Sequence, residues 1–178
     1  TGFNNIDIQA TQKRNIPVSN IRNYGTAAVA QHTFALLLAL TNHVSNHHQN
    51  IIGGQWQKTR DFCFWNKPLI ELYNKKLGIV GFGQIGQKVA EIARSFGMKI
   101  MIFQPNIKKA LPNDILLVND LKTLFSESDV VSLHCTLKAE NQDFVNKNLL
   151  ECMKKTAYLI NTARGALVNE NDLFEAIS

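Results

Sequence analysis

The sequence has no hydrophobic run long enough to cross a membrane. Its longest run, Phe34 to Leu40, is far shorter than the about 20 apolar residues that a spanning helix needs. The three cysteines, Cys63, Cys135 and Cys152, are widely spaced without a C-x-x-C pair, which argues against a disulfide framework or a zinc site and fits reduced thiols in a cytoplasmic protein. Basic runs are missing too, because the 19 Lys and Arg are dispersed. The net charge of +5 therefore predicts a mildly basic surface rather than nucleic-acid binding.

What the sequence does contain is a glycine-rich turn between two apolar segments. Leu77 to Val80 is a short apolar strand, and Gly81 to Gly86 then reads G-x-G-x-x-G. Ile85 to Phe96 carries apolar residues at helical spacing, Gly97 predicts the end of that helix, and Lys99 to Phe103 returns as a second strand. A strand, glycine turn, helix and strand in about 30 residues is the unit that binds dinucleotides.

The three glycines of this turn have separate physical tasks. Gly81 allows the tight turn out of the strand, and Gly86 lets helix and strand approach closely. Gly83 lacks the side chain that would keep a pyrophosphate away from the backbone, and the anion would then lie at the helix N-terminus. Glycine-rich turns also serve as plain connections, but the flanking elements favour a nicotinamide or flavin dinucleotide.

The remaining sequence predicts an α/β protein with a doubly wound, parallel, Rossmann-like sheet. Thr26 is the expected N-cap of a long helix that is apolar around much of its circumference and should be buried between layers or between subunits. Open parallel sheets bind their ligands at the carboxyl ends of the strands, so we expect the binding site at those ends. Further strands are expected at 115–118, 129–134 and 157–160, and further helices at 120–125, 146–153 and 169–177. The strand ends are Gly81 to Gly86, Gln104, His134 to Thr136 and Asn161 to Gly165.

Arg164 is the charged residue at these strand ends. It follows an apolar strand and precedes Gly165, and a guanidinium there can hold a carboxylate by two parallel hydrogen bonds and polarise an adjacent carbonyl, although a surface ion pair would give the same pattern. His134 could donate a proton, but a structural role beside main-chain contacts to a cofactor is the favoured interpretation. His32, on the apolar helix, is expected to be a buried, hydrogen-bonded histidine.

Five motifs in order resemble the D-isomer-specific 2-hydroxyacid dehydrogenase family over nearly the whole chain. The segment DFCFWNKPLIEL, residues 61–72, is most similar to the glycerate dehydrogenase, or hydroxypyruvate reductase, branch. The motifs are TGFNNID at 1–7, YGTAAVAQHTFALLLAL at 24–40, LGIVGFGQIG at 77–86, SDVVSLHC at 128–135 and LINTARGALV at 159–168.

This resemblance implies a division of the chain into two parts. Residues 1–23 would be the tail of a substrate domain with its hinge, and 24–178 an incomplete dinucleotide-binding domain truncated at its C-terminus. In the family, hydride passes between the nicotinamide and a small 2-keto acid. The family's arginine that corresponds to Arg164 binds the substrate carboxylate and carbonyl. The proton comes from a histidine paired with a glutamate, and both are expected beyond Ser178. The fragment alone is therefore expected to be inactive.

The resemblance also implies a set of cofactor contacts and a partner. The family's long helix and the aromatic loop after it serve dimerisation, which predicts a homodimer acting on a small 2-keto or 2-hydroxy acid, with no metal and no membrane. The expected cofactor-binding residues are Thr1, Gly81, Gly83, Gln84, Ile85, Gly86, Gln104, His134, Cys135, Thr136, Thr162, Ala163 and Arg164.

Gln104 departs from the family pattern. Most members have an aspartate at this strand end, whose carboxylate binds the adenosine ribose and repels a 2′-phosphate. Gln104 can bind the ribose without excluding the phosphate, and Lys108 and Lys109 lie close enough in sequence to attract one. We therefore expect NAD with weakened discrimination, so that NADP is an alternative. A dinucleotide-sensing corepressor of the same fold is the alternative function.

Overall fold

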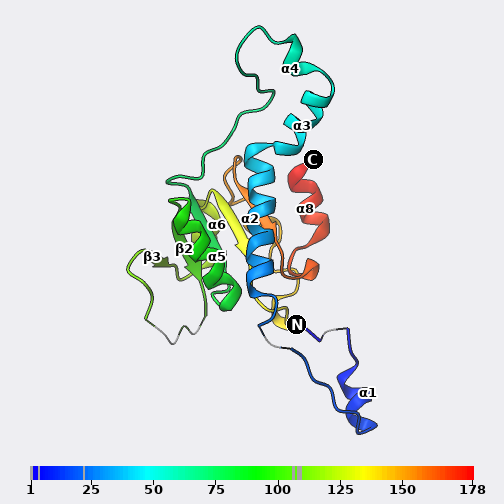
Figure 1. The fold of residues 1–178 in the computed structure, drawn as a ribbon. Helices are drawn as coiled ribbons and strands as arrows, with labels where there is room; N and C mark the ends of the chain where they lie inside the picture. The colour runs from blue at the N-terminus through cyan, green and yellow to red at the C-terminus, as the bar shows by residue number, and fades with distance from the viewer. Residues whose placement is uncertain (1, 4, 22, 106, 108–109) are drawn as a thin grey trace.

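The computed structural model describes residues 2–3, 5–21, 23–105, 107 and 110–178. Within them the strands form a five-stranded sheet in the order β3-β2-β1-β4-β5, and every neighbouring pair is parallel (Figure 1). The chain runs outward from β1 to β3 on one side and from β4 to β5 on the other, which confirms the predicted doubly wound topology. The strands are β1 (Lys76–Val80), β2 (Lys99–Phe103), β3 (Ile115–Leu117), β4 (Val130–Leu133) and β5 (Tyr158–Asn161).

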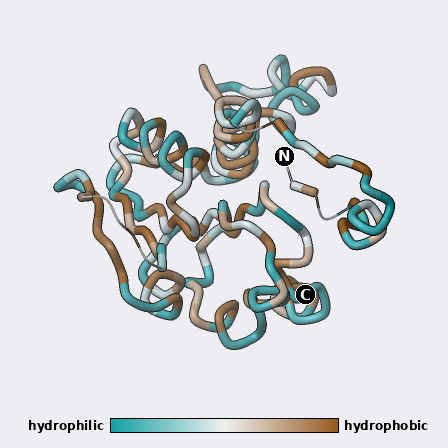
Figure 2. Tube along the Cα trace, turned by 90° about the horizontal axis from the view of Figure 1, so that it is seen from below, coloured by the Kyte–Doolittle hydropathy of each residue, from teal (hydrophilic) through white to brown (hydrophobic). Residues whose placement is uncertain are grey.

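Alternating strand residues build a core on each face of the sheet, and Figure 2 shows helices on both sides of the strands. On one face, Ile79 and Ile102 pack in one cluster with residues of α2 (Thr26–Asn42) and α5 (Gln84–Ser95). The opposite face packs against the helices α6 (Leu121–Glu127) and α7 (Lys147–Leu150), with α8 (Glu170–Ile177) beside α7. Both faces of the strands are covered, as is usual for a parallel sheet.

The glycine unit has the predicted geometry. Gly81 has a φ of +94°, and α5 ends before Gly97, whose φ is +67°. A Cβ on Gly86 would lie 2.3 Å from the carbonyl oxygen of Gly81, so only glycine allows α5 to start this close to β1. The expectations for the turn, for the close helix packing and for the helix stop are confirmed.

Several element boundaries differ from the sequence-based expectation. The long helix begins at Thr26 with Gly25 as its N-cap, so Thr26 is not the cap, and its hydroxyl instead donates to Asn23 O at 3.2 Å. Its end is set by His43, whose φ of +50° interrupts the helix before α3 (Val44–Ile52). Residues 1–23, for which no helix was predicted, contain α1 (Ile8–Lys13), capped by the side chain of Asp7. Short additional elements are α4 (Gln55–Lys58) and the 3-10 helices η1 (Ala139–Asn141) and η2 (Gly165–Leu167).

Only one side of α2 is buried. Phe34 and Leu37 belong to the core, whereas Leu36 and Leu40 are 38% and 41% exposed. The prediction for His32 was wrong, because it lies on the exposed side of this helix. A core helix needs apolar residues on one side, so the additional apolar residues of α2 led to the wrong orientation for His32.

Two segments project from the body of the protein. Figure 1 shows α1 at one end of the molecule and α3 with α4 at the other. The aromatic segment near α4 is packed only in part. Trp56 contacts Phe64 edge to face with ring centroids 5.7 Å apart, while Phe62 and Trp65 are 93% and 65% exposed.

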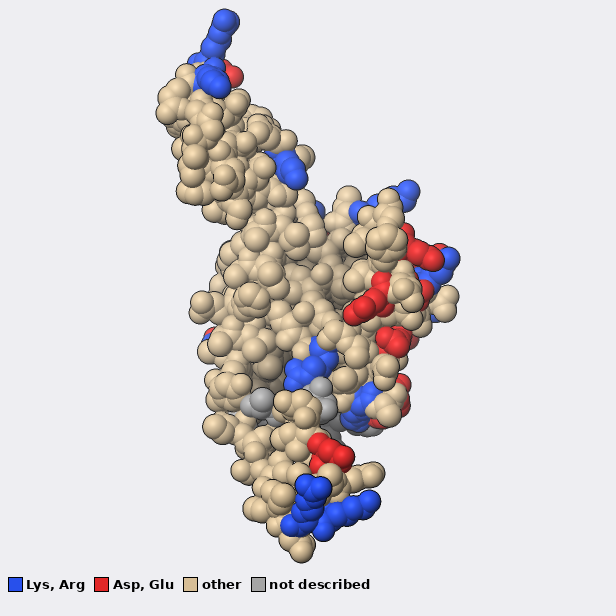
Figure 3. All heavy atoms as spheres, turned by 90° about the vertical axis from the view of Figure 1, so that its right-hand side faces the viewer, with Lys and Arg blue, Asp and Glu red and all other residues tan. Residues whose placement is uncertain are grey.

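The surface agrees with the expectation of dispersed charge. On the face drawn in Figure 3, Lys and Arg lie in separate groups, on the two projecting ends and between them, rather than in one patch. The thiols of Cys63, Cys135 and Cys152 are free. Among the helices of the described ranges, none has the length and apolarity that crossing a bilayer requires.

Candidate functional site

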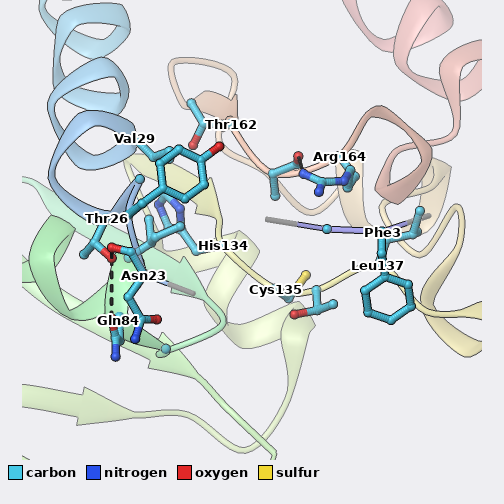
Figure 4. Close-up of a pocket in the computed structure, with 17 residues that line it drawn as sticks. Phe3, Asn23, Thr26, Val29, Gln84, His134, Cys135, Leu137, Thr162 and Arg164 are labelled. Carbon is cyan, nitrogen blue, oxygen red and sulfur yellow. Dashed lines mark hydrogen bonds between the residues drawn. The ribbon is translucent and has the colours of Figure 1, made fainter. Parts of the chain in front are cut away.

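A cavity of about 560 Å³ opens at the carboxyl ends of β1, β4 and β5 (Figure 4). It contains most of the residues that the strand ends predict. These are Gly83, Gln84, Ile85, His134, Cys135, Thr136, Thr162, Ala163 and Arg164. Gly81 and Gly86 shape the turn without lining the cavity, Gln104 does not line it, and Thr1, Lys108 and Lys109 lie outside the described residues.

The β1 end supplies a place for an anion. Space around Gly83 is open, because a Cβ built there would meet nothing within 4 Å. Gly83 is also the N-cap of α5 and provides no side-chain hydrogen bond to the helix. The first N–H groups of a helix have no intrahelical partner and carry partial positive charge. The arrangement therefore suits a phosphate group lying against the turn.

The side chain of Gln104, at the end of β2, stabilises this turn by hydrogen bonds to the backbone. Its Oε1 accepts a hydrogen bond from Phe82 N at 2.7 Å, and its Nε2 donates to Pro105 O at 3.0 Å. One amide hydrogen and one lone pair of the carboxamide then remain for a ligand. This second function, holding the glycine turn, was not expected from the sequence.

His134 at the end of β4 is a neutral, mostly buried imidazole. Its Nε2 lies 2.8 Å from the hydroxyl of the buried Ser132, and its backbone N–H donates to Val80 O at 2.8 Å. Burial lowers the pKa of His134 to about 4. At neutral pH the ring is therefore not an imidazolium with a proton to give, which supports the structural role that we expected for it.

The loop after His134 is held by a residue that the sequence analysis missed. The side chain of Asn141 donates from Nδ2 to Thr136 O at 2.9 Å and accepts at Oδ1 from Lys138 N at 2.7 Å. In this loop, burial raises the pKa of the Cys135 thiol, so the thiol stays protonated at neutral pH. Asn141 could have been suspected only as a capping residue of a short helix.

The turn after β5 carries the positive charge of the cavity, the guanidinium of Arg164. Asn161 closes the following turn, because its Nδ2 donates to Arg164 O at 2.8 Å and its Oδ1 accepts from Ala163 N at 3.0 Å. Arg164 donates from Nη1 to Ala163 O at 2.7 Å. With His134 neutral, Arg164 is the one charged side chain among the described residues that line the cavity. A cavity with this charge favours an anionic ligand.

The chain leading into α2 and the first turn of that helix form a wall that the strand ends did not predict. Tyr24 and Thr26 line the cavity together with the glycine turn, and the Thr26 hydroxyl lies 3.5 Å from Gln84 Oε1. Gly25 at a helix start and the family motif at 24–40 were the sequence signals at this position. The other lining residues missed from sequence are Gly2, Phe3, Asn23, Val29 and Leu137. Within the described part of the chain, no group of three or more His, Cys, Asp or Glu side chains is arranged to hold a metal ion.

Comparison with known proteins gives consistent matches. Residues 34–178 match the family model "D-isomer specific 2-hydroxyacid dehydrogenase, NAD binding domain". A hydroxypyruvate reductase of Blautia hydrogenotrophica is 42% identical over 100% of this chain and 55% of its own length. The TT0316 protein of Thermus thermophilus superposes with a TM-score of 0.86 at 37% identity, covering 99% of this chain and 54% of that one. An acyclic imino acid reductase in complex with NADPH and D-Arg gives 0.82 at 34% identity, covering 97% and 54%. The chain thus spans about half the length of the curated relatives it matches.

The neutral state of His134 predicts a pH dependence of stability. The folded-state pKa lies below that of an unfolded histidine, so the unfolded chain alone takes up a proton between about pH 6.5 and pH 4. The free energy of unfolding should therefore fall by up to about 3 kcal/mol as the pH is lowered through this window. His134→Gln should lose this contribution, measured by urea denaturation across the window.

His32→Gln, on the exposed side of α2, is the matched control and should keep the wild-type pH dependence. An identical pH dependence in His134→Gln and the wild type would show that His134 is not held neutral.

Proposed function

The chain belongs to the D-isomer specific 2-hydroxyacid dehydrogenase family, and we propose that its protein reduces a small 2-keto acid to the D-2-hydroxy acid with a nicotinamide dinucleotide. The observation that carries this proposal is the position of Arg164, the one charge among the described lining residues, in the same cavity as the uncapped start of α5. The similarity to a hydroxypyruvate reductase favours hydroxypyruvate or glyoxylate as the substrate.

The residues at the β1 end fit a dinucleotide. The open space at Gly83 and the first N–H groups of α5 suit its pyrophosphate, and Gln84 and Ile85 line the same cavity. Thr162 to Arg164 line it from the β5 end, where the nicotinamide would be bound. When bound, the dihydronicotinamide supplies a hydride to the keto carbon. The protein's own residues then have to bind and orient the keto acid.

Arg164 is suited to that task. Its guanidinium can donate two parallel hydrogen bonds to the substrate carboxylate and a further one to the neighbouring carbonyl oxygen. A hydrogen bond to this oxygen gains strength as negative charge develops on it. His134 is neutral and bonded to Ser132, so it is a poor acid for this oxygen. We propose that the proton comes from the glutamate-paired histidine expected beyond Ser178.

Cofactor choice depends on Gln104. Its carboxamide is neutral and already holds Phe82 N and Pro105 O, so this strand end lacks the negative charge that would exclude a 2′-phosphate. We propose NADH as the cofactor with NADPH accepted as well. A structurally similar imino acid reductase in complex with NADPH supports the second cofactor.

A homodimer is the proposed assembly. Leu36 and Leu40 expose apolar surface on α2, and Trp56 and Trp65 expose more on the projecting segment. Exposed apolar patches of this kind mark protein interfaces.

The three free thiols fit the reducing cytoplasm as the compartment of this protein.

Turnover by the full-length protein tests the proposed function. NADH oxidation is followed with hydroxypyruvate, glyoxylate, pyruvate and phenylpyruvate as substrates. Arg164→Gln should lower kcat/KM by at least about 100-fold, because two charge-assisted hydrogen bonds to the substrate are lost. Arg94→Gln removes a guanidinium on the surface of α5 and should leave kcat/KM unchanged.

Absence of turnover by the wild type on all four acids, with dinucleotide binding intact, would instead favour the corepressor-type regulator. Wild-type activity in Arg164→Gln would remove the assigned role of this residue.

The cofactor proposal is tested by Gln104→Asp. The new carboxylate should raise the dissociation constant for NADPH relative to that for NADH by about tenfold, because a like charge is placed beside the 2′-phosphate. Dissociation constants for both cofactors are measured by the fluorescence of the bound dihydronicotinamide. Gln104→Asn shortens the side chain equally without charge and serves as the control. An unchanged NADPH-to-NADH ratio in Gln104→Asp would contradict the proposal.

The dimer is tested by charges on the exposed side of α2. The variant Leu36→Glu with Leu40→Glu should convert a dimer to a monomer, because buried unpaired carboxylates oppose association. Analytical ultracentrifugation of the full-length protein measures this. Leu116→Glu, 55% exposed on the edge strand β3, is the control and should remain dimeric. A monomeric wild type, or a dimer that survives both charges on α2, would contradict the proposed interface.

A further inference from the structure

A buried hydroxyl on α2 reaches the turn that carries Arg164. Thr33 is 2% exposed, and its Oγ1 lies 3.1 Å from the Oγ1 of Thr162, a residue 129 positions away in the sequence. Thr162 lies in the cavity wall between Asn161 and Arg164. The contact therefore joins the long helix before the nucleotide-binding unit to the last strand end of the site.

The direction of the hydrogen bonds follows from the partners. Thr33 Oγ1 also lies 2.9 Å from Val29 O, and a carbonyl oxygen can only accept. The single hydroxyl hydrogen of Thr33 is used there, so Thr162 must donate to Thr33 for both contacts to form. Thr162 is thus held by a hydroxyl that is itself fixed to the backbone of α2.

Asn161 is the last residue of β5, paired with Leu133 of β4, and its side chain bonds within the turn. The carboxamide of Asn161 bonds Arg164 O and Ala163 N, which fixes the shape of the turn but not its position relative to α2. The bond from Thr162 to Thr33 adds a direct side-chain link from this turn to α2, which packs in the same core cluster as the strands through Phe34 and Leu37.

We infer that Thr33 is a positioning residue for substrate binding, acting through Thr162 on the turn from which Arg164 holds the carboxylate. This inference rests on the proposed function. Its consequence is specific: loss of the Thr33 hydroxyl displaces Arg164 and weakens the ground-state contact with the keto acid, while the dinucleotide contacts at the β1 end stay in place.

Thr33→Val, Thr33→Ser and Thr41→Val in the full-length protein test it. Thr33→Val keeps the shape and loses the bond, and should raise KM for hydroxypyruvate at least about fivefold. This effect should exceed its effect on NADH affinity, because the pyrophosphate contacts lie at the β1 end. Thr33→Ser keeps the hydroxyl and should restore the wild-type KM. Thr41→Val is a matched control, since Thr41 is buried on the same helix and donates to Leu37 O in the same way, away from the cavity. Thr33→Ala also removes the hydroxyl and replaces Thr33→Val if that variant does not fold.

Binding of oxalate to the protein with NADH, measured by calorimetry, gives a readout that does not need turnover. Oxalate presents the same paired oxygens to Arg164, so Thr33→Val should lower the affinity for oxalate by about the same factor by which it raises KM. Normal turnover with an unchanged KM and unchanged oxalate affinity in Thr33→Val overturns the inference and leaves the proposed function standing. No turnover by the wild type overturns the proposed function, and weaker oxalate binding in Thr33→Val then shows that Thr33 positions Arg164 for a carboxylate ligand other than a reduced keto acid.

Discussion

The close approach of three backbone segments at Gly81 is the constraint on which the site depends. A Cβ on Gly81 would lie 2.6 Å from Cys135 N, and a Cβ on Gly86 would lie 2.3 Å from Gly81 O. His134 N is meanwhile bonded to Val80 O. Any side chain at these two glycines would separate the end of β1 from the loop after β4 or from the start of α5. Because those three segments form walls of the cavity, its shape is fixed by contacts that only glycine permits.

Each strand-end loop is then held by a neutral side chain. Gln104 holds the glycine turn, Asn141 the loop after His134, and Asn161 the turn before Arg164. A carboxylate in place of Asn141 or Asn161 could still accept from the backbone N–H groups, but it could not donate to Thr136 O or Arg164 O. It would also attract the guanidinium and repel an anionic substrate. Carboxamides and hydroxyls stabilise the loops without competing for Arg164. This explains how a single positive charge can dominate a cavity that is otherwise crowded with polar groups.

The local features of this fold were predictable from the sequence, and the long-range ones were not. Helical spacing, the G-x-G-x-x-G turn and Gly97 are signals within a few residues, so the β1-α5-β2 unit and the parallel sheet could be expected. Orientation is a tertiary property: the apolar circumference of α2 could not tell which side faces the core, and His32 was wrongly expected to be buried. The pairing of Thr33 with Thr162 left no sequence signal at all, because two threonines 129 residues apart meet only after the sheet has formed.

Helix α2 connects features that the sequence presents as separate. Its first residues line the cavity at Thr26, its buried side anchors Thr162 through Thr33, and its exposed leucines face the proposed dimer interface. Because packed interiors transmit strain, a force on the outer side of this helix moves its inner side as well. Contacts between subunits at Leu36 would therefore act on the helix turn next to Thr33, one hydroxyl contact away from the turn that carries Arg164. On these two proposals, dimer formation and substrate positioning depend on the same helix.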